Sequence, residues 1–274
     1  MKKVEKFINS HLHLLRRISQ IGSLVLIIAI PFLNKSGINI LKGTYYSISI
    51  GELDIIDPAI ALQMILLTKS ILITVLLMMI VPVVLAMILG KVFCSWACPF
   101  NFIAELLGKL KKSPSIHSRN PKTFHYWTIF GIILLSMTVF GIPIIVFISM
   151  PGQISALIAD AIFNGILGIE ILLVIVILAI EFLFNRNFWC KYVCPVGATL
   201  SLFRIKKTIK VTYEPNKCAK CEGKKDSPCI AVCPLNLNPR LSGAYPYCYN
   251  CFECVNTCRK NGGALNISFE KKLN

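Results

Sequence analysis

Charged residues are scarce in this chain. Asp, Glu, Lys and Arg make up only 15% of its 274 residues, whereas 55% are hydrophobic. Ordinary soluble domains contain about 25% charged residues. The composition therefore excludes an ordinary soluble domain and predicts a membrane protein.

Acidic residues and nucleotide-binding loops are also lacking. The 13 acidic residues are outnumbered by 29 basic ones, which gives a net charge of +16. The sequence contains no Gly-x-Gly-x-x-Gly turn after a strand, no Walker-type phosphate loop and no nucleic-acid-binding motif. We therefore expect no nucleotide, flavin or nucleic-acid partner, and we expect the positive charge to face the headgroups of membrane lipid.

Four apolar stretches are candidates for transmembrane helices. A helix of about 20 residues covers the roughly 30 Å hydrocarbon core of a bilayer. The first stretch is the shortest, and no small-residue cleavage site follows Pro31, so we interpret it as an anchor rather than a signal peptide. The predicted spans are Ile18–Leu33, Ser70–Leu89, Tyr126–Ile148 and Gly165–Phe184.

The distribution of lysine and arginine predicts the orientation. Of the 29 basic residues, 26 fall in residues 1–17, 90–125 and 185–274, and only two fall in residues 34–57 and 149–164. Basic loops remain on the cytoplasmic side of a membrane. We therefore expect a multi-pass protein of the inner (cytoplasmic) membrane with both termini in the cytoplasm.

Eight of the 12 cysteines lie near the C-terminus in two runs. The second run has the C-x2-C-x2-C-x3-C spacing of 4Fe-4S ferredoxins, and the first run has seven residues between its second and third cysteines. In two-cluster ferredoxins the fourth cysteine of each run ligates the other cluster. Structural zinc and disulfides fit this spacing less well. The predicted ligands are Cys218, Cys221, Cys229 and Cys258 for one 4Fe-4S cluster, and Cys248, Cys251, Cys254 and Cys233 for the other.

These features predict a fold of two parts. One is an α-helical membrane protein with four transmembrane helices, and the other is a small C-terminal α+β ferredoxin-like module with two 4Fe-4S clusters. The expected units are a cytoplasmic N-terminus at residues 1–17, the membrane domain at 18–198, a linker on lipid headgroups at 199–217 and the module at 218–274.

The other four cysteines form an internal repeat. The segments KVFCSWACPFN and NFWCKYVCPVG share an aromatic-Cys-x3-Cys-Pro core, and corresponding cysteines are 96 residues apart. Each half of the membrane domain enters from the cytoplasm, returns and ends in this motif, which predicts two parallel repeats. Residues i and i+4 share a helix face, so we expect four thiols to meet at the cytoplasmic membrane surface. They are Cys94, Cys98, Cys190 and Cys194.

The role of these four thiols is open at the level of sequence. They could bind a cofactor as a third metal centre, or they could act as redox-active dithiols. They could also be inert thiols that shape a helix end and a partner surface, since buried cysteine often behaves as a small hydrophobic residue.

Glu170 and Glu181 lie in the fourth apolar stretch. An ionisable residue inside a membrane is costly and is a functional candidate. Glu170 is our candidate catalytic residue, as a proton acceptor, whereas Glu181 lies close enough to Arg186 for a simple ion pair. Asp57 precedes Pro58 and an apolar helical pattern, so we expect it to be a helix N-cap.

The sequence resembles the NapH family, the membrane-bound quinol dehydrogenase component of the periplasmic nitrate reductase system. The resemblance covers nearly the whole chain and lies in Phe93–Pro99, Trp189–Ala198, the loop Lys42–Gln63 and the C-terminal cysteine runs. It implies four spans, cytoplasmic termini, two cytoplasmic 4Fe-4S clusters and electrons drawn from the quinol pool. The insert Glu222–Pro228 departs from the family pattern and leaves the subfamily and terminal acceptor open.

Two functions follow from these observations. In the first, quinol is oxidised in the membrane domain and its electrons pass through the clusters to a partner ferredoxin or cytochrome. In the second, the clusters supply reductant for the maturation of another metalloenzyme. We favour the first, because the resemblance covers the full length of the chain.

Overall fold

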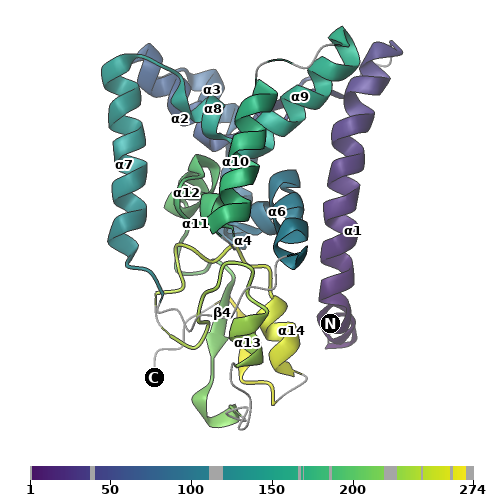
Figure 1. Cartoon of the computed structure of the whole chain (residues 1–274), viewed down its shortest axis with the longest axis vertical. Helices are drawn as coiled ribbons and strands as arrows, with labels where there is room; N and C mark the ends of the chain where they lie inside the picture. Colours follow the sequence, from purple (N-terminus) through teal and green to yellow (C-terminus); the bar gives the residue numbers. More distant parts are fainter. Residues whose placement is uncertain are drawn as a thin grey trace.

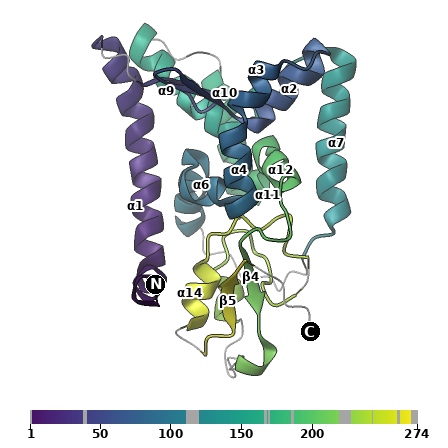
Figure 2. The same cartoon turned by 180° about the vertical axis from the view of Figure 1, so that it is seen from behind.

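The chain folds into a helical part and a small α+β module that packs against one end of it (Figures 1 and 2). This is a computed structural model. The residues that the structure describes are 2–37, 41–110, 120–165, 168, 170–184, 187–218, 227–241, 243–259 and 262–269.

Two helices are long and apolar enough to cross a membrane. They are α1 (Lys2–Lys35), over Leu12–Lys35, and α7 (Thr123–Phe140). Large apolar side chains such as Phe32 and Leu135 are exposed on them, as expected for helices that contact lipid. The helix α7 ends at Phe140 rather than at the predicted Ile148, because Gly141 adopts a left-handed conformation (φ 69°) and Pro143 follows it.

The other two predicted spans are helical but shorter. The stretch Ile73–Leu89 consists of α3 (Ile73–Met78) and α4 (Ile80–Leu89). The helix α10 (Glu170–Phe184) has 15 residues, which give a length of about 22 Å. It is bent by 95° from the segment Phe188–Leu202, which contains α11 (Phe188–Tyr192) and α12 (Pro195–Leu202). By length and composition, the described residues thus contain two helices that could span a membrane, or three such segments if this bent pair forms a single span.

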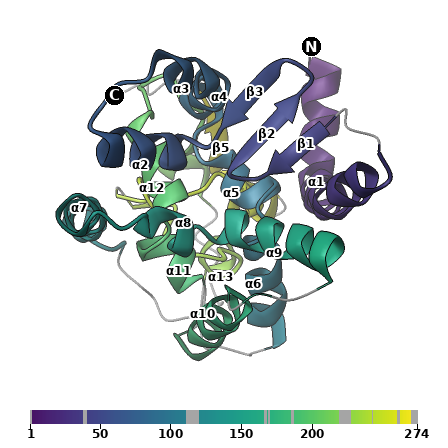
Figure 3. The same ribbon diagram turned by 90° about the horizontal axis from the view of Figure 1, so that it is seen from above.

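A three-stranded antiparallel sheet lies at the end of the molecule away from the module (Figure 3). It consists of β1 (Leu41–Thr44), β2 (Ser47–Ile50) and β3 (Leu53–Ile56), and β1 packs against α1 and α9 (Met150–Asn164). The chain then enters α2 (Pro58–Thr68), where the Asp57 carboxylate accepts a hydrogen bond from the Ala59 amide at 2.8 Å. The expectation that Asp57 is an N-cap is confirmed.

Four short helices surround the two Cys-x3-Cys-Pro motifs. In each motif the proline is the first residue of a new helix, so the chain turns at the motif instead of continuing straight. The helices are α5 (Val92–Trp96) and α6 (Pro99–Leu110) around the first motif, and α11 and α12 around the second; α8 (Ile144–Ile148) precedes α9.

The C-terminal module contains a two-stranded antiparallel sheet in which β4 (Lys210–Tyr213) pairs with β5 (Leu265–Ser268). Because β4 lies within residues 199–217, part of the segment expected as a linker pairs with β5 of the module, whereas residues 199–202 belong to α12. Leu12 of α1 packs into the core of the module. The remaining elements are α13 (Pro228–Ala231), α14 (Glu253–Arg259) and the 3-10 turn Pro215–Lys217.

Arg16 joins the two parts. Its side chain is only 1% exposed. Its guanidinium contacts Glu105 of α6, donates to the Ser95 carbonyl at 3.1 Å and donates to Glu253 of α14 at 3.1 Å. Buried charges are stable only when they are paired and hydrogen-bonded, so this arrangement fixes α1, α6 and the module relative to one another.

Candidate functional site

Four cysteines of the module line one small cavity of about 30 Å³. Cys254 belongs to α14, Cys233 follows α13, and Cys248 and Cys251 lie in the loop between them. These are the four residues that the spacing assigns to a single cluster, and they come from both cysteine runs. The structure thus places Cys233 of the first run beside the three cysteines of the second run, although Cys233 is at least 15 positions from each of them. This is the grouping expected for crossed ligands.

Asn250 and Phe252 position the loop around Cys251. Both adopt left-handed conformations, with φ of 54° and 60°, which turn the chain sharply on either side of this cysteine. The Asn250 side chain donates to the carbonyls of Leu89 and Ile209 at 3.0 Å each and accepts from the Tyr245 hydroxyl at 2.8 Å. The loop is therefore held against the end of α4.

The other predicted set is brought together in part. Cys229 is buried, Cys258 packs against the same core, and Arg240 hydrogen-bonds the thiol of Cys229 and lies near Cys218. Cys221 lies outside the described residues. Since Cys254 and Cys229 share one buried cluster of side chains, the two sets of cysteines are neighbours.

The donor set fits an iron-sulfur cluster. Burial raises the pKa of Cys233 to about 11, so the free thiol is neutral, and coordination to iron would deprotonate it. Among the described residues no three His, Cys, Asp or Glu side chains converge closely enough to hold a single metal ion. Four thiols around an apolar cavity suit a cluster whose irons each take one thiolate.

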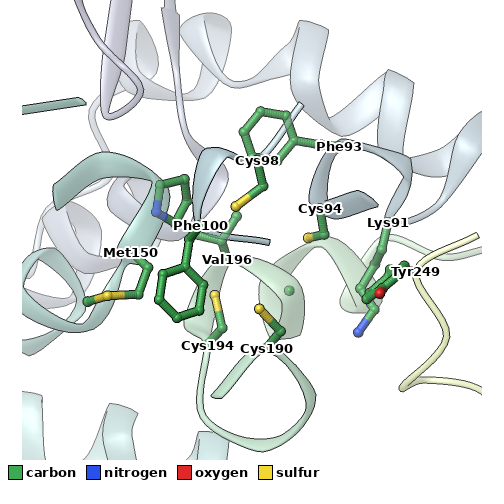
Figure 4. Close-up of a pocket in the computed structure, with 12 residues that line it drawn as sticks. Lys91, Phe93, Cys94, Cys98, Phe100, Met150, Cys190, Cys194, Val196 and Tyr249 are labelled. Carbon is green, nitrogen blue, oxygen red and sulfur yellow. The ribbon is translucent and has the colours of Figure 1, made fainter. Parts of the chain in front are cut away.

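The four cysteines of the repeat line a second cavity of about 20 Å³. Cys94 lies in α5 and Cys190 in α11, whereas Cys98 and Cys194 directly precede the prolines that begin α6 and α12. Figure 4 shows the four side chains grouped around this cavity. The two halves of the chain contribute one pair each.

Tyr249 separates the two cavities, because its side chain lines both. Its hydroxyl contacts Asn187 at 3.2 Å and Glu105 at 3.4 Å. Its carbonyl accepts a hydrogen bond from the hydroxyl of Ser95, which lies between Cys94 and Cys98, at 2.8 Å. The loop that carries the module cysteines is therefore in direct contact with the first Cys-x3-Cys-Pro motif.

Two buried lysines accompany these sites. Lys91 is 5% exposed and donates to the Tyr126 hydroxyl at 3.0 Å, and Lys191 is 7% exposed and donates to the Leu235 carbonyl at 3.1 Å, close to Cys233. Sequence reasoning missed these lysines as well as Tyr249. These three residues lie within the cysteine motifs, and that position was the only signal in the sequence for a role at the sites. The spacing of the cysteines does not indicate whether the residues between them are buried.

The acidic candidates belong to different elements of the fold. Glu170 is half-buried at the start of α10. Glu181 accepts hydrogen bonds from the amides of Phe188 and Trp189 at 2.7 Å each, so it caps α11 at the bend; its expected partner Arg186 lies outside the described residues. Burial raises the pKa of Asp57 to about 6.

Asp57 and Glu170 share a neighbour in the turn between β1 and β2. Burial, followed by the nearby charges of Asp57 and Glu170, raises the pKa of the Tyr46 hydroxyl. Asp57 is also within electrostatic reach of Cys94 and Cys194. A carboxyl group with a pKa of about 6 thus directly follows the three-stranded sheet and lies within electrostatic reach of the repeat cysteines.

One protein-family model matches a segment in each half of the helical part. A protein-family model described as a 4Fe-4S binding domain matches residues 71–117 and 166–212. Each match contains one Cys-x3-Cys-Pro motif, which supports the internal repeat. No solved structure matches the chain.

Several curated proteins are similar over most of the chain. An uncharacterized protein of Methanocaldococcus jannaschii is 30% identical over 203 residues, which cover 71% of this chain and 79% of that protein. The ferredoxin-type protein NapH of Haemophilus influenzae is 26% identical over 93% of this chain and 89% of its own length. The methylamine utilization ferredoxin-type protein MauN of Methylorubrum extorquens is 27% identical over 84% of this chain and 77% of its own length.

Proposed function

Because this chain belongs to the NapH-like family of ferredoxin-type 4Fe-4S electron-transfer proteins, we propose that it takes electrons from quinol and passes them through two module clusters to a redox partner. The partner would be a ferredoxin or a cytochrome. The observation that supports this most directly is the contact between the two cysteine sites through Tyr249 and Ser95.

The proposed ligands of the module clusters are the two crossed sets. Cys233, Cys248, Cys251 and Cys254 would hold the cluster next to the membrane domain, since Tyr249 closes their cavity on that side. Cys218, Cys221, Cys229 and Cys258 would hold the outer cluster. When bound, such clusters accept and donate single electrons. The chain's own residues exclude water from them and, through Lys191 and Arg240, place positive charge beside the thiolates.

We place the protein in the inner membrane with four membrane-embedded segments and both termini in the cytoplasm. The bias of basic residues toward residues 1–17, 90–125 and 185–274 supports this orientation. Exposed apolar side chains on all four segments, such as Val25, Leu77, Leu135 and Ile175, support contact with lipid.

Quinol would be oxidised on the outer side of the cysteine cavity, between the two repeats. Glu170 is the proton acceptor that the sequence suggests, and Asp57 is a second candidate because it is within electrostatic reach of Cys94 and has a pKa of about 6. A general base works best when its pKa is near the working pH. The Tyr46 hydroxyl lies near both carboxylates and would help to orient a quinol hydroxyl.

The test is anaerobic reduction of the purified full-length protein by a menaquinol analogue, followed by the visible absorbance of the clusters. We expect the clusters to be reduced, with dithionite as the positive control. If no quinol analogue reduces clusters that dithionite reduces, and if reduced clusters fail to reduce a quinone, the quinol function is wrong. The alternative, a reductant for maturing another metalloenzyme, would then take its place.

A further inference from the structure

We propose that Cys94, Cys98, Cys190 and Cys194 hold a third 4Fe-4S cluster, shared between the two repeats. The proposal concerns a metal site beyond the two clusters of the module. Its role as an intermediate electron carrier rests on the proposed function, whereas its existence does not.

The composition of the cavity is the first argument. It has four thiols, as does the module cavity whose ligands follow the ferredoxin spacing, and the two cavities have similar volumes of about 20 and 30 Å³. Its walls include Phe93, Phe100, Met150 and Val196. No aspartate, glutamate or histidine is among the described residues that line it, so cysteine is the only strong metal ligand there.

The backbone around the second cysteine of each motif is the next argument. The amides of Phe100 and Asn101, at the start of α6, lie close to the thiol of Cys98. The amides of Val196 and Gly197, at the start of α12, lie close to the thiol of Cys194 in the same way. Helix N-termini favour negative charge. The same arrangement thus occurs in both repeats and suits thiolate ligands.

The buried charge of Lys91 is a further argument for thiolate ligands in this cavity. The positive charge of Lys91 lies close to Cys94 and Cys194, and Lys91 is itself buried. Burying a lysine is costly unless negative charge lies nearby. Four neutral thiols would leave Lys91 with a phenolic hydroxyl as its partner, whereas cluster thiolates would offset its charge.

The position of the cavity suits a cluster that carries electrons between the quinol site and the module. The cavity lies between Asp57 on the outer side and Tyr249 on the module side. A cluster there would accept one electron from the quinol side and donate it past Tyr249 to the cluster at Cys248, so that no long gap separates the membrane domain from the module.

Iron analysis of the anaerobically purified full-length protein tests the proposal without any quinol. The three clusters should give about 12 irons and 12 acid-labile sulfides per chain, against about eight for two clusters. The double variant Cys98→Ser with Cys194→Ser should lose about four irons, and the double variant Cys94→Ala with Cys190→Ala should lose the same number. Met150→Leu, which changes the same cavity without removing a thiol, should retain all of them.

Two outcomes would overturn the proposal. One is a fully loaded wild-type protein with about eight irons, which decides the matter even if the variants fail to fold. The other is the finding, by differential alkylation, that these four cysteines alternate between disulfides and free thiols while the iron content stays at about eight; this would make them redox-active dithiols. Neither result would contradict the proposed reduction of the module clusters by quinol, because the iron analysis does not involve quinol.

Discussion

At the scale of single residues, Arg16 is the side chain on which the contact between the helical part and the module depends most. It touches Glu105, Glu253 and the Ser95 carbonyl while almost fully buried. Removing one partner of a buried ion pair costs about 3–5 kcal/mol because the remaining charges are left uncompensated. We expect Arg16→Gln to destabilise the docked module by an amount in this range.

Thermal unfolding in detergent and limited proteolysis of the module would measure this effect. The matched control is Arg17→Gln, since Arg17 also pairs with Glu105 but its side chain is 21% exposed. Because the Arg17 guanidinium is partly exposed, solvent screens this pair, so Arg17→Gln should cost less than Arg16→Gln. Equal loss of stability in both variants would contradict the assignment of Arg16 as the main link.

Asp57 gives a prediction about pH. Its pKa of about 6 means that the carboxylate, the only form that accepts a proton, is lost as the pH falls through about 6. We expect reduction of the clusters by quinol to slow as the pH falls below this value, whereas reduction by dithionite should not show the same step.

The variant Asp57→Asn should remove this pH step and slow the quinol reaction at pH 7. Asparagine is as good an N-cap as aspartate, so α2 should remain intact. The parallel variant Glu170→Gln distinguishes the two carboxyl groups. If Glu170→Gln abolishes the step and Asp57→Asn leaves it unchanged, Glu170 is the acceptor and the assignment to Asp57 is wrong.

At the scale of secondary-structure elements, the end of α4 shows how the module approaches the membrane domain. Gly90 follows α4 with φ 68° and ψ −139°, a conformation that is nearly restricted to glycine. A Cβ atom at this position would lie 3.0 Å from the Asn250 amide nitrogen and 3.2 Å from Thr208. Only glycine lets the Asn250 loop pack this closely.

We expect Gly90→Ala to cost about 1–3 kcal/mol in strain and to loosen the loop that carries Cys248 and Cys251. The measurement is the rate of cluster loss in the presence of an iron chelator, which should increase. Gly131→Ala is the control, because Gly131 lies within α7 with nothing within 4 Å of the added Cβ, and alanine favours a helix. An unchanged rate in Gly90→Ala would contradict this account of the docking.

At the scale of the whole molecule, the prediction concerns topology. Both termini should face the cytoplasm, since basic residues are concentrated on the segments that would lie there. A reporter that is active only in the cytoplasm should therefore be active when fused after Asn274. An active alkaline phosphatase at the same position would contradict the orientation and the compartment of the clusters.

The sequence alone was enough to predict the apolar character of the chain, the family, the internal repeat and the N-cap at Asp57. Each of these follows from local composition or from residues at fixed spacing, which need no knowledge of distant contacts. The apolar stretches beginning at Ser70 and Gly165 were recognised as helical for the same reason. Their short helices, and the 95° bend that follows α10, were not predicted, because hydropathy reports how apolar a segment is and not where the chain turns.

How the sites relate to one another became visible only in the folded chain. Ser95 lies beside Tyr249, Arg16 is buried against two glutamates, and the Cys94 and Cys190 motifs meet at one cavity. These contacts join residues that are 89 to 237 positions apart. Such contacts depend on how helices pack, which side-chain spacing along the chain does not encode. The contact between the helical part and the module is therefore a property of the fold.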